Sequence, residues 1–191
     1  MVNMFLIAPS ISLTDSYFDF RFKMNLEDIP SLWTMLWQIA LFMLVGEFTF
    51  YWVHRIIHLP KFYWIHKEHH EYNVTMSLAP QYAHPIEHIF ANTIPVGIGY
   101  KFLSKVYPVH IFTILVWITM RMFETCDGHC GYNWPWGQSQ LLPFSAGGSY
   151  HYFHHKQNVG NYGAILNLFD VVFDTNNEYY KGKSTDGAKN D

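Results

Sequence analysis

The sequence predicts an all-α protein, a single domain over residues 1–191 built as an integral membrane helical bundle. Three observations lead to this fold class. Half of the residues are apolar, 19% are aromatic and only 14% are charged, whereas soluble domains carry about 25% charged residues. One apolar run is long enough to cross a bilayer, and histidines recur at helical spacing. The net charge is −3, and the basic residues are scattered, which argues against nucleic acid as a partner.

The first apolar run covers residues 32–53 and follows Pro30 and Ser31, a plausible helix start. Its 22 residues would extend about 33 Å as a helix, enough to cross a hydrocarbon core of about 30 Å. The alternative is a buried helix of a soluble protein. Glu47 interrupts the run, either to orient a histidine or to line the bundle interior. Residues 1–31 contain no segment long enough to span a bilayer.

The second apolar region lies between His88 and Glu124. Residues 89–103 contain Pro95, Gly97 and Gly99, which predicts a broken or re-entrant segment. Residues 108–123 form a more regular apolar stretch, so we expect a hairpin that enters the membrane and returns. Residues 131–149 are rich in turn residues, residues 165–173 form a short apolar stretch, and residues 178–191 form a polar tail.

Eleven of the twelve histidines fall into clusters, and most lie three or four residues apart, which places them on one face of a helix. The exception is His110, which we leave out because a lone histidine is more often structural. The candidate metal ligands are His54, His58, His66, His69, His70, His84, His88, His129, His151, His154 and His155.

So many imidazoles exceed the four ligands of a structural zinc site, and we infer two metal ions that share the set. Facing helices of a bundle would point the ligands inward. The spacing does not identify the metal, because imidazole binds iron, zinc and copper alike. Open positions would allow either hydrolysis or oxygen activation, and the membrane setting favours oxidation of a water-insoluble substrate. Cys126 and Cys130 match known zinc-ligand spacing only weakly.

The order of these motifs resembles that of the fatty acid hydroxylase and sterol desaturase superfamily of membrane di-iron oxygenases. The histidine boxes are HRIIH from His54, HKEHH from His66 and HYFHH from His151. The stretches YAHPIE from Tyr82 and ETCDGHCGYNWPW from Glu124 make the C4-methylsterol oxidases the most similar branch. The resemblance covers roughly residues 30–177.

This resemblance implies a non-haem di-iron oxygenase, a methylsterol monooxygenase, that oxidises the C4 methyl group of a sterol in sterol biosynthesis. Electrons would come from NAD(P)H through cytochrome b5 or a similar carrier. The eight box histidines would bind iron, with His84, His88 and His129 as further ligands or neighbours of ligands. Glu124 and Asp127 would either hold a ligand imidazole in one tautomer or have no role at the site. The enzyme would be a multi-pass protein of the endoplasmic reticulum membrane, its site toward the cytosol.

Two alternatives stay open. The chain could be another superfamily member, such as a sterol desaturase or lipid hydroxylase, or a non-catalytic metal-binding membrane protein. The superfamily normally carries transmembrane sequence before the helix that precedes the first box, and residues 1–31 do not supply it. We therefore expect either a truncated chain or a short divergent member.

Overall fold

The computed structural model describes residues 22–137, 141–145 and 147–181, and these are mostly helical, which confirms the all-α prediction. The chain divides into two compact units. The first comprises Met1–Thr49 and Pro85–Met122, and the second Phe50–His84 and Phe123–Asp191. The organisation of residues 1–191 as one domain stays a prediction. Residues 1–21 of the predicted N-terminal segment and 182–191 of the predicted polar tail lie outside the described residues.

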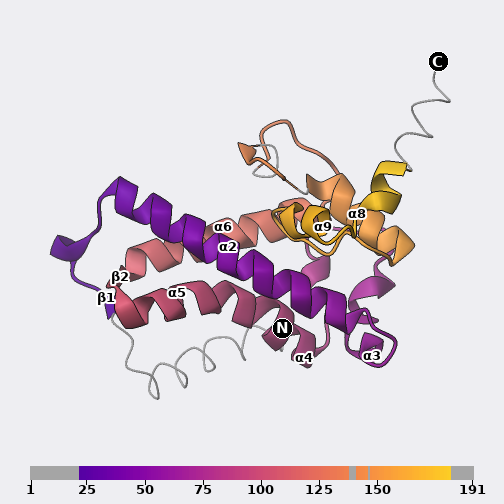
Figure 1. Cartoon of the computed structure of the whole chain (residues 1–191), viewed down its shortest axis with the longest axis horizontal. Helices are drawn as coiled ribbons and strands as arrows, with labels where there is room; N and C mark the ends of the chain where they lie inside the picture. The colour runs from indigo at the N-terminus through magenta and orange to yellow at the C-terminus, as the bar shows by residue number, and fades with distance from the viewer. Residues whose placement is uncertain (1–21, 138–140, 146, 182–191) are drawn as a thin grey trace. The chain divides into compact units, whose positions relative to one another are not determined.

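The predicted apolar helix is confirmed and is longer than expected. Helix α2 covers Leu32–Ile57 (Figure 1). Ser31 begins it, because its hydroxyl accepts a hydrogen bond from the backbone N–H of Thr34 at 3.2 Å. Apolar side chains lie all round the helix, and Trp33 remains 75% exposed. Among the residues that the structure describes, α2 is the one helix long and apolar enough to cross a membrane.

The segment predicted to be broken is helical instead. After α4 (Pro85–Glu87), the π-helix η4 covers His88–Thr93 and leads directly into α5 (Ile94–Val106). Pro95 lies in the first turn of α5, where its fixed φ suits the helix. The chain thus stays helical through Pro95, and the π-helical turns before it are a departure from regular geometry. The re-entrant hairpin stays a prediction.

Two glycines, one in α5 and one in α2, allow these helices to approach closely. A Cβ atom on Gly99 of α5 would lie 2.8 Å from the Cα of Phe42 in α2. A Cβ atom on Gly46 of α2 would lie 2.8 Å from the carbonyl oxygen of Pro95. Figure 1 shows α5 alongside α2. These glycines are thus packing residues rather than points of flexibility.

Helix α6 covers Ile111–His129 and begins in the first unit. There the Arg121 guanidinium donates to Oε1 of Glu47 at 3.1 Å, with both side chains buried. Of the two roles considered for Glu47, this ion pair favours lining the bundle interior over orienting a histidine. Before α6, strand β2 (Val109–His110) pairs in parallel with β1 (Phe22–Lys23). His110 caps α6, because its Nδ1 accepts from the Phe112 N–H at 3.0 Å.

The second unit contains short helices joined by turns. They are α3 (Tyr63–His66), the 3-10 helices η2 (His69–Glu71) and η3 (Ala79–Gln81), α8 (Gly147–Gln157) and α9 (Leu168–Val172). Their histidines are mostly buried.

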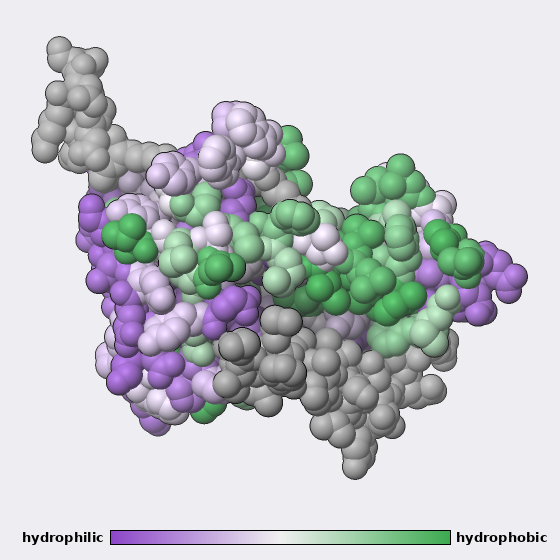
Figure 2. All heavy atoms as spheres, turned by 180° about the vertical axis from the view of Figure 1, so that it is seen from behind, coloured by the Kyte–Doolittle hydropathy of each residue, from purple (hydrophilic) through white to green (hydrophobic). Residues whose placement is uncertain are grey.

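The surface of the first unit is strongly apolar. Figure 2 shows hydrophobic side chains gathered over its helices on the face drawn there. The exposed apolar residues include Phe102 at 69% and Leu32 at 67%. Large contiguous apolar surfaces of this kind are rare on soluble monomers and are typical of contact with a membrane or another protein.

Candidate metal centre

Nine histidines of the second unit form two groups whose ring nitrogens converge. Within each group, the candidate ligand atoms lie within 4.8 Å of one another. The first group consists of His54, His58, His66, His70 and His154, and the second of His69, His129, His151 and His155. All nine were predicted as ligands from the sequence.

Each histidine box delivers its side chains through a different backbone element. His54 lies on α2, and His58 follows on one more helical turn, since its N–H donates to the His54 carbonyl at 3.2 Å. His66 ends α3, and η2 carries the next two histidines of that box. Helix α8 holds the third box, and His129 is the last residue of α6. The second and third boxes each contribute histidines to both groups.

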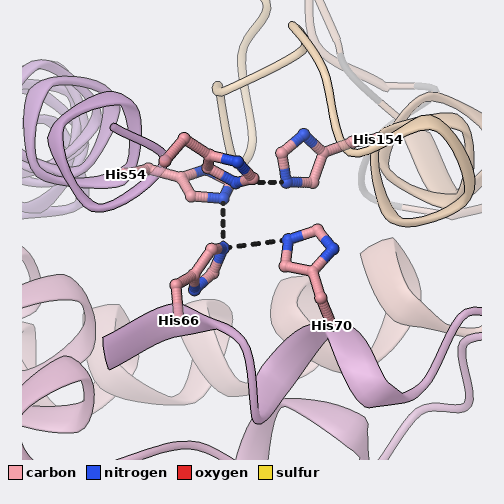
Figure 3. Close-up of side chains that lie close together, drawn as sticks. His54, His66, His70 and His154 are labelled. Carbon is pink, nitrogen blue, oxygen red and sulfur yellow. Dashed lines mark hydrogen bonds between the residues drawn. The ribbon is translucent and has the colours of Figure 1, made fainter. Parts of the chain in front are cut away.

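The first group is a compact set of imidazoles (Figure 3). Nε2 of His66 lies 3.1 Å from Nε2 of His54 and 3.0 Å from Nε2 of His70. Nε2 of His58 lies 3.1 Å from Nε2 of His154. In Figure 3 the four labelled rings, His54, His66, His70 and His154, point into one common space.

The second group is equally compact. Nε2 of His129 lies 2.8 Å from Nε2 of His151 and 3.3 Å from Nε2 of His69. Nε2 of His155 lies 3.2 Å from Nε2 of His151. The two groups are neighbours, because the rings of His70 and His155 stack with centroids 4.6 Å apart.

These separations fit metal coordination. Metal–imidazole bonds measure about 2.0–2.1 Å, so neighbouring nitrogens of one tetrahedral or octahedral ion lie about 2.8–3.4 Å apart. The Nε2 pairs in both groups, at 2.8 to 3.3 Å, fall within that range. The donor set therefore fits two adjacent metal ions, one in each group.

Backbone carbonyls fix the tautomer of three of these rings. Nδ1 of His54 lies 2.9 Å from the Tyr162 oxygen, Nδ1 of His154 lies 2.6 Å from the Gly160 oxygen, and Nδ1 of His129 lies 2.9 Å from the Thr125 oxygen. A carbonyl only accepts, so each Nδ1 must carry the proton. Each Nε2 then keeps its lone pair and points it into its group, as a metal ligand requires.

Burial keeps these imidazoles neutral. Desolvation lowers the pKa of His69 to about 4. Desolvation, with the charge on His69 as a further cause, lowers the pKa of His70 to about 3. Burial and then the charges of neighbouring histidines hold the pKa values of His151 and His154 well below 6.5. At neutral pH all four are available to bind a cation.

Two predicted ligands lie outside both groups. The His84 ring contacts Trp64 edge-on, with centroids 5.4 Å apart. His88 belongs to the first unit and begins η4; it is buried, and neither ring nitrogen has a hydrogen-bond partner among the residues that the structure describes. A metal-binding role for these two stays a prediction.

The groups that accept the Nδ1 protons of the converging histidines could not be recognised from the sequence. Glu124 and Asp127 were considered as partners of a ligand imidazole, yet the Nδ1 of His129 donates to the backbone carbonyl of Thr125. The other two carbonyl partners belong to loop 158–163, which the sequence indicates only as a turn. Any residue supplies a carbonyl, so no side-chain pattern marks this role.

The chain matches the family model described as fatty acid hydroxylase over residues 39–175. It is 40% identical over 147 residues to a methylsterol monooxygenase of Aspergillus fumigatus, covering 76% of this chain and 50% of that protein. It is 35% identical over 156 residues to a C-4 methylsterol oxidase of Schizosaccharomyces pombe, covering 81% of this chain and 52% of that protein.

A relative with a different name is also similar. A very-long-chain aldehyde decarbonylase of Oryza sativa subsp. indica is 34% identical over 175 residues, covering 88% of this chain and 63% of that protein. The chain thus spans about half the length of the methylsterol-oxidising relatives described above. No solved structure matches it significantly. The matched residues include all nine converging histidines, and the chain belongs to the fatty acid hydroxylase family.

Proposed function

We propose that this protein is a membrane-bound di-iron oxygenase that oxidises the C4 methyl group of a sterol. The observation that carries the proposal is the pair of adjacent all-histidine groups, five residues in one and four in the other. The names of two relatives, a methylsterol monooxygenase and a C-4 methylsterol oxidase, support the choice of substrate.

The nine histidines would hold two iron ions, which supply oxygen activation when bound. The chain's own part is to keep these imidazoles neutral and to aim their Nε2 atoms inward. Burial accomplishes the first task, and for His54, His129 and His154 the carbonyls of residues 162, 125 and 160 accomplish the second. Such fixed geometry spares the site a reorganisation when the metals bind.

The membrane setting fits a water-insoluble substrate. Helix α2 has the length and the apolar surface of a membrane span and delivers His54 from its last turns. We propose that the protein crosses the endoplasmic reticulum membrane several times and that its metal pair faces the cytosol. Electrons would come from NAD(P)H through cytochrome b5 or a similar carrier, and lipid would surround the helices.

The test is rescue of yeast cells that lack their own C4-methylsterol oxidase, followed by sterol profiling. We expect the chain to remove 4-methyl groups and to restore growth, and His151→Ala to abolish both because it removes a ligand of the second group. Lys156→Ala is the matched control, because Lys156 is an exposed residue of the same helix, α8.

Other products in this assay would indicate a different function. A new double bond or hydroxyl group on a lipid would indicate a desaturase or hydroxylase of the same family. Conversion of a long-chain aldehyde would point to the activity named for the rice relative. Two bound metals without turnover of any lipid would indicate a non-catalytic metal-binding protein.

A further inference from the structure

Loop 158–163 holds an unusual backbone conformation beside the first histidine group. Asn158, Gly160 and Asn161 all have φ values between 53° and 63°. This left-handed region is costly for residues other than glycine. A Cβ on Gly160 would collide with the Thr175 carbonyl oxygen. The loop keeps this shape because something outside it holds it in place.

One such group is Asp170, a fully buried residue of α9. Its Oδ1 accepts the Tyr162 N–H at 2.8 Å, and its Oδ2 accepts the Gly163 N–H at 2.7 Å. The Thr175 hydroxyl donates to Oδ1 at 2.6 Å. One carboxylate thus binds two consecutive N–H groups of the loop. Charge-assisted hydrogen bonds of this kind are among the strongest in proteins.

The carbonyls of the same loop point the other way. The Gly160 and Tyr162 oxygens accept the Nδ1 protons of His154 and His54. A continuous chain of hydrogen bonds therefore runs from the Asp170 carboxylate through the Tyr162 peptide groups to the His54 ring. Both histidines belong to the first group, whereas His129 of the second group takes its carbonyl from Thr125, within its own helix.

We propose that Asp170 is a positioning residue: through loop 158–163 it fixes the Nδ1–H tautomer of His54 and His154 and so prepares the first metal group, but not the second. The inference rests on the proposed metal pair and goes beyond it, because it assigns a site-selective role to a residue that binds the loop backbone. Asp170 touches neither metal nor substrate in this assignment.

The substitution that tests this is Asp170→Asn. The asparagine can keep one oxygen toward Tyr162 and Thr175, but its NH2 group then faces the Gly163 N–H, and two donors cannot pair. We expect the loop to shift and both carbonyls to lose their alignment. The matched control is Asp174→Asn, which removes the same charge from an exposed residue with φ 55°, a conformation that asparagine tolerates.

The first readout is the tautomer, measured on the metal-free chain of residues 1–191 labelled with 15N-histidine. Long-range 15N–1H NMR distinguishes Nδ1–H from Nε2–H rings. We expect His54 and His154 to become tautomer mixtures in Asp170→Asn, while His129 stays Nδ1–H and reports that the fold is intact. Unchanged tautomers at His54 and His154 would overturn the proposal.

The second readout is the affinity for zinc, titrated in competition with a chelator. The wild type and Asp174→Asn should bind two ions, and Asp170→Asn should bind one of them about 10- to 100-fold more weakly. Equal weakening at both groups, or at neither, would contradict the assignment. If Asp170→Asn fails to fold, Thr175→Val removes one donor from the carboxylate and should produce a smaller change at the same group. A wild-type chain that binds no zinc pair would instead refute the proposed metal centre itself, so the two failures are distinguishable.

Discussion

Individual histidines show what their spacing along the sequence can predict about the site and what it cannot. His154 and His155 are adjacent in sequence, yet they belong to different groups. Spacing along a helix indicates which side chains share a face, and eight of the nine converging histidines have another histidine three or four residues away; His129 does not. It does not indicate which face meets which in three dimensions. His84 and His88 have the same four-residue spacing as His54 and His58, and both lie outside the two groups.

His88 yields a prediction at this scale. A buried polar group without a partner costs about 1–3 kcal/mol, and both ring nitrogens of His88 lack one among the described residues. We expect His88→Leu, which removes these nitrogens at similar volume, to raise the stability by about 1 kcal/mol and to leave two metals bound. Thermal unfolding in detergent and metal analysis measure these effects.

His129→Leu is the comparison for that experiment, because it removes a ligand of the second group and should lower the metal content. Metal loss in His88→Leu would show instead that the ligand role predicted for His88 is correct.

At the scale of elements, the long helix was the most predictable part. Apolar residues on every side of residues 32–53 left few alternatives, and α2 begins at the predicted residue. The region after His88 was less predictable, because glycine has two uses that look alike in a sequence. It can relax the backbone, or it can let another helix approach. Gly99 and Gly46 serve the second use.

Two neighbouring glycines of α5 provide a matched pair. A methyl group on Gly99 would collide with the Phe42 backbone at 2.8 Å, whereas one on Gly97 would make ordinary contacts, the nearest with the Tyr100 hydroxyl at 3.5 Å. We expect Gly99→Ala to destabilise the protein by about 1–3 kcal/mol and Gly97→Ala to stabilise it by about 0.5–1 kcal/mol, the usual helical gain. The shift of the unfolding midpoint measures both, and equal shifts would exclude close packing at Gly99.

At the scale of the whole molecule, the histidine groups couple stability to pH. The folded state holds His69 and His70 neutral down to pH values of about 4 and about 3, whereas in the unfolded chain histidine protonates near pH 6.5, about its usual pKa. Between these limits the unfolded state binds more protons, so acid favours unfolding. Stability is fully present above pH of about 6.5 and is lost as the pH falls.

We therefore expect the free energy of unfolding of the metal-free protein to fall by about 1.4 kcal/mol per pH unit for each such histidine between pH values of about 6.5 and 4. Bound metal should be released over the same range, because protons compete for the imidazoles. Denaturant unfolding at a series of pH values, with and without zinc, measures both effects. A free energy of unfolding that is constant from pH 7 to 5 would contradict the burial of neutral imidazoles.

The donor set has one more consequence. Every candidate ligand in both groups is a histidine, which binds a metal as an uncharged ring. Carboxylate ligands would cancel part of the charge of two divalent ions, but these imidazoles would leave it intact. We propose that oxidation of the methyl group proceeds through an alcohol and an aldehyde to a carboxylic acid. The first two products are neutral, but the acid is an anion beside a strongly cationic centre. We expect departure of that acid, rather than cleavage of the C–H bond, to limit the turnover of this enzyme.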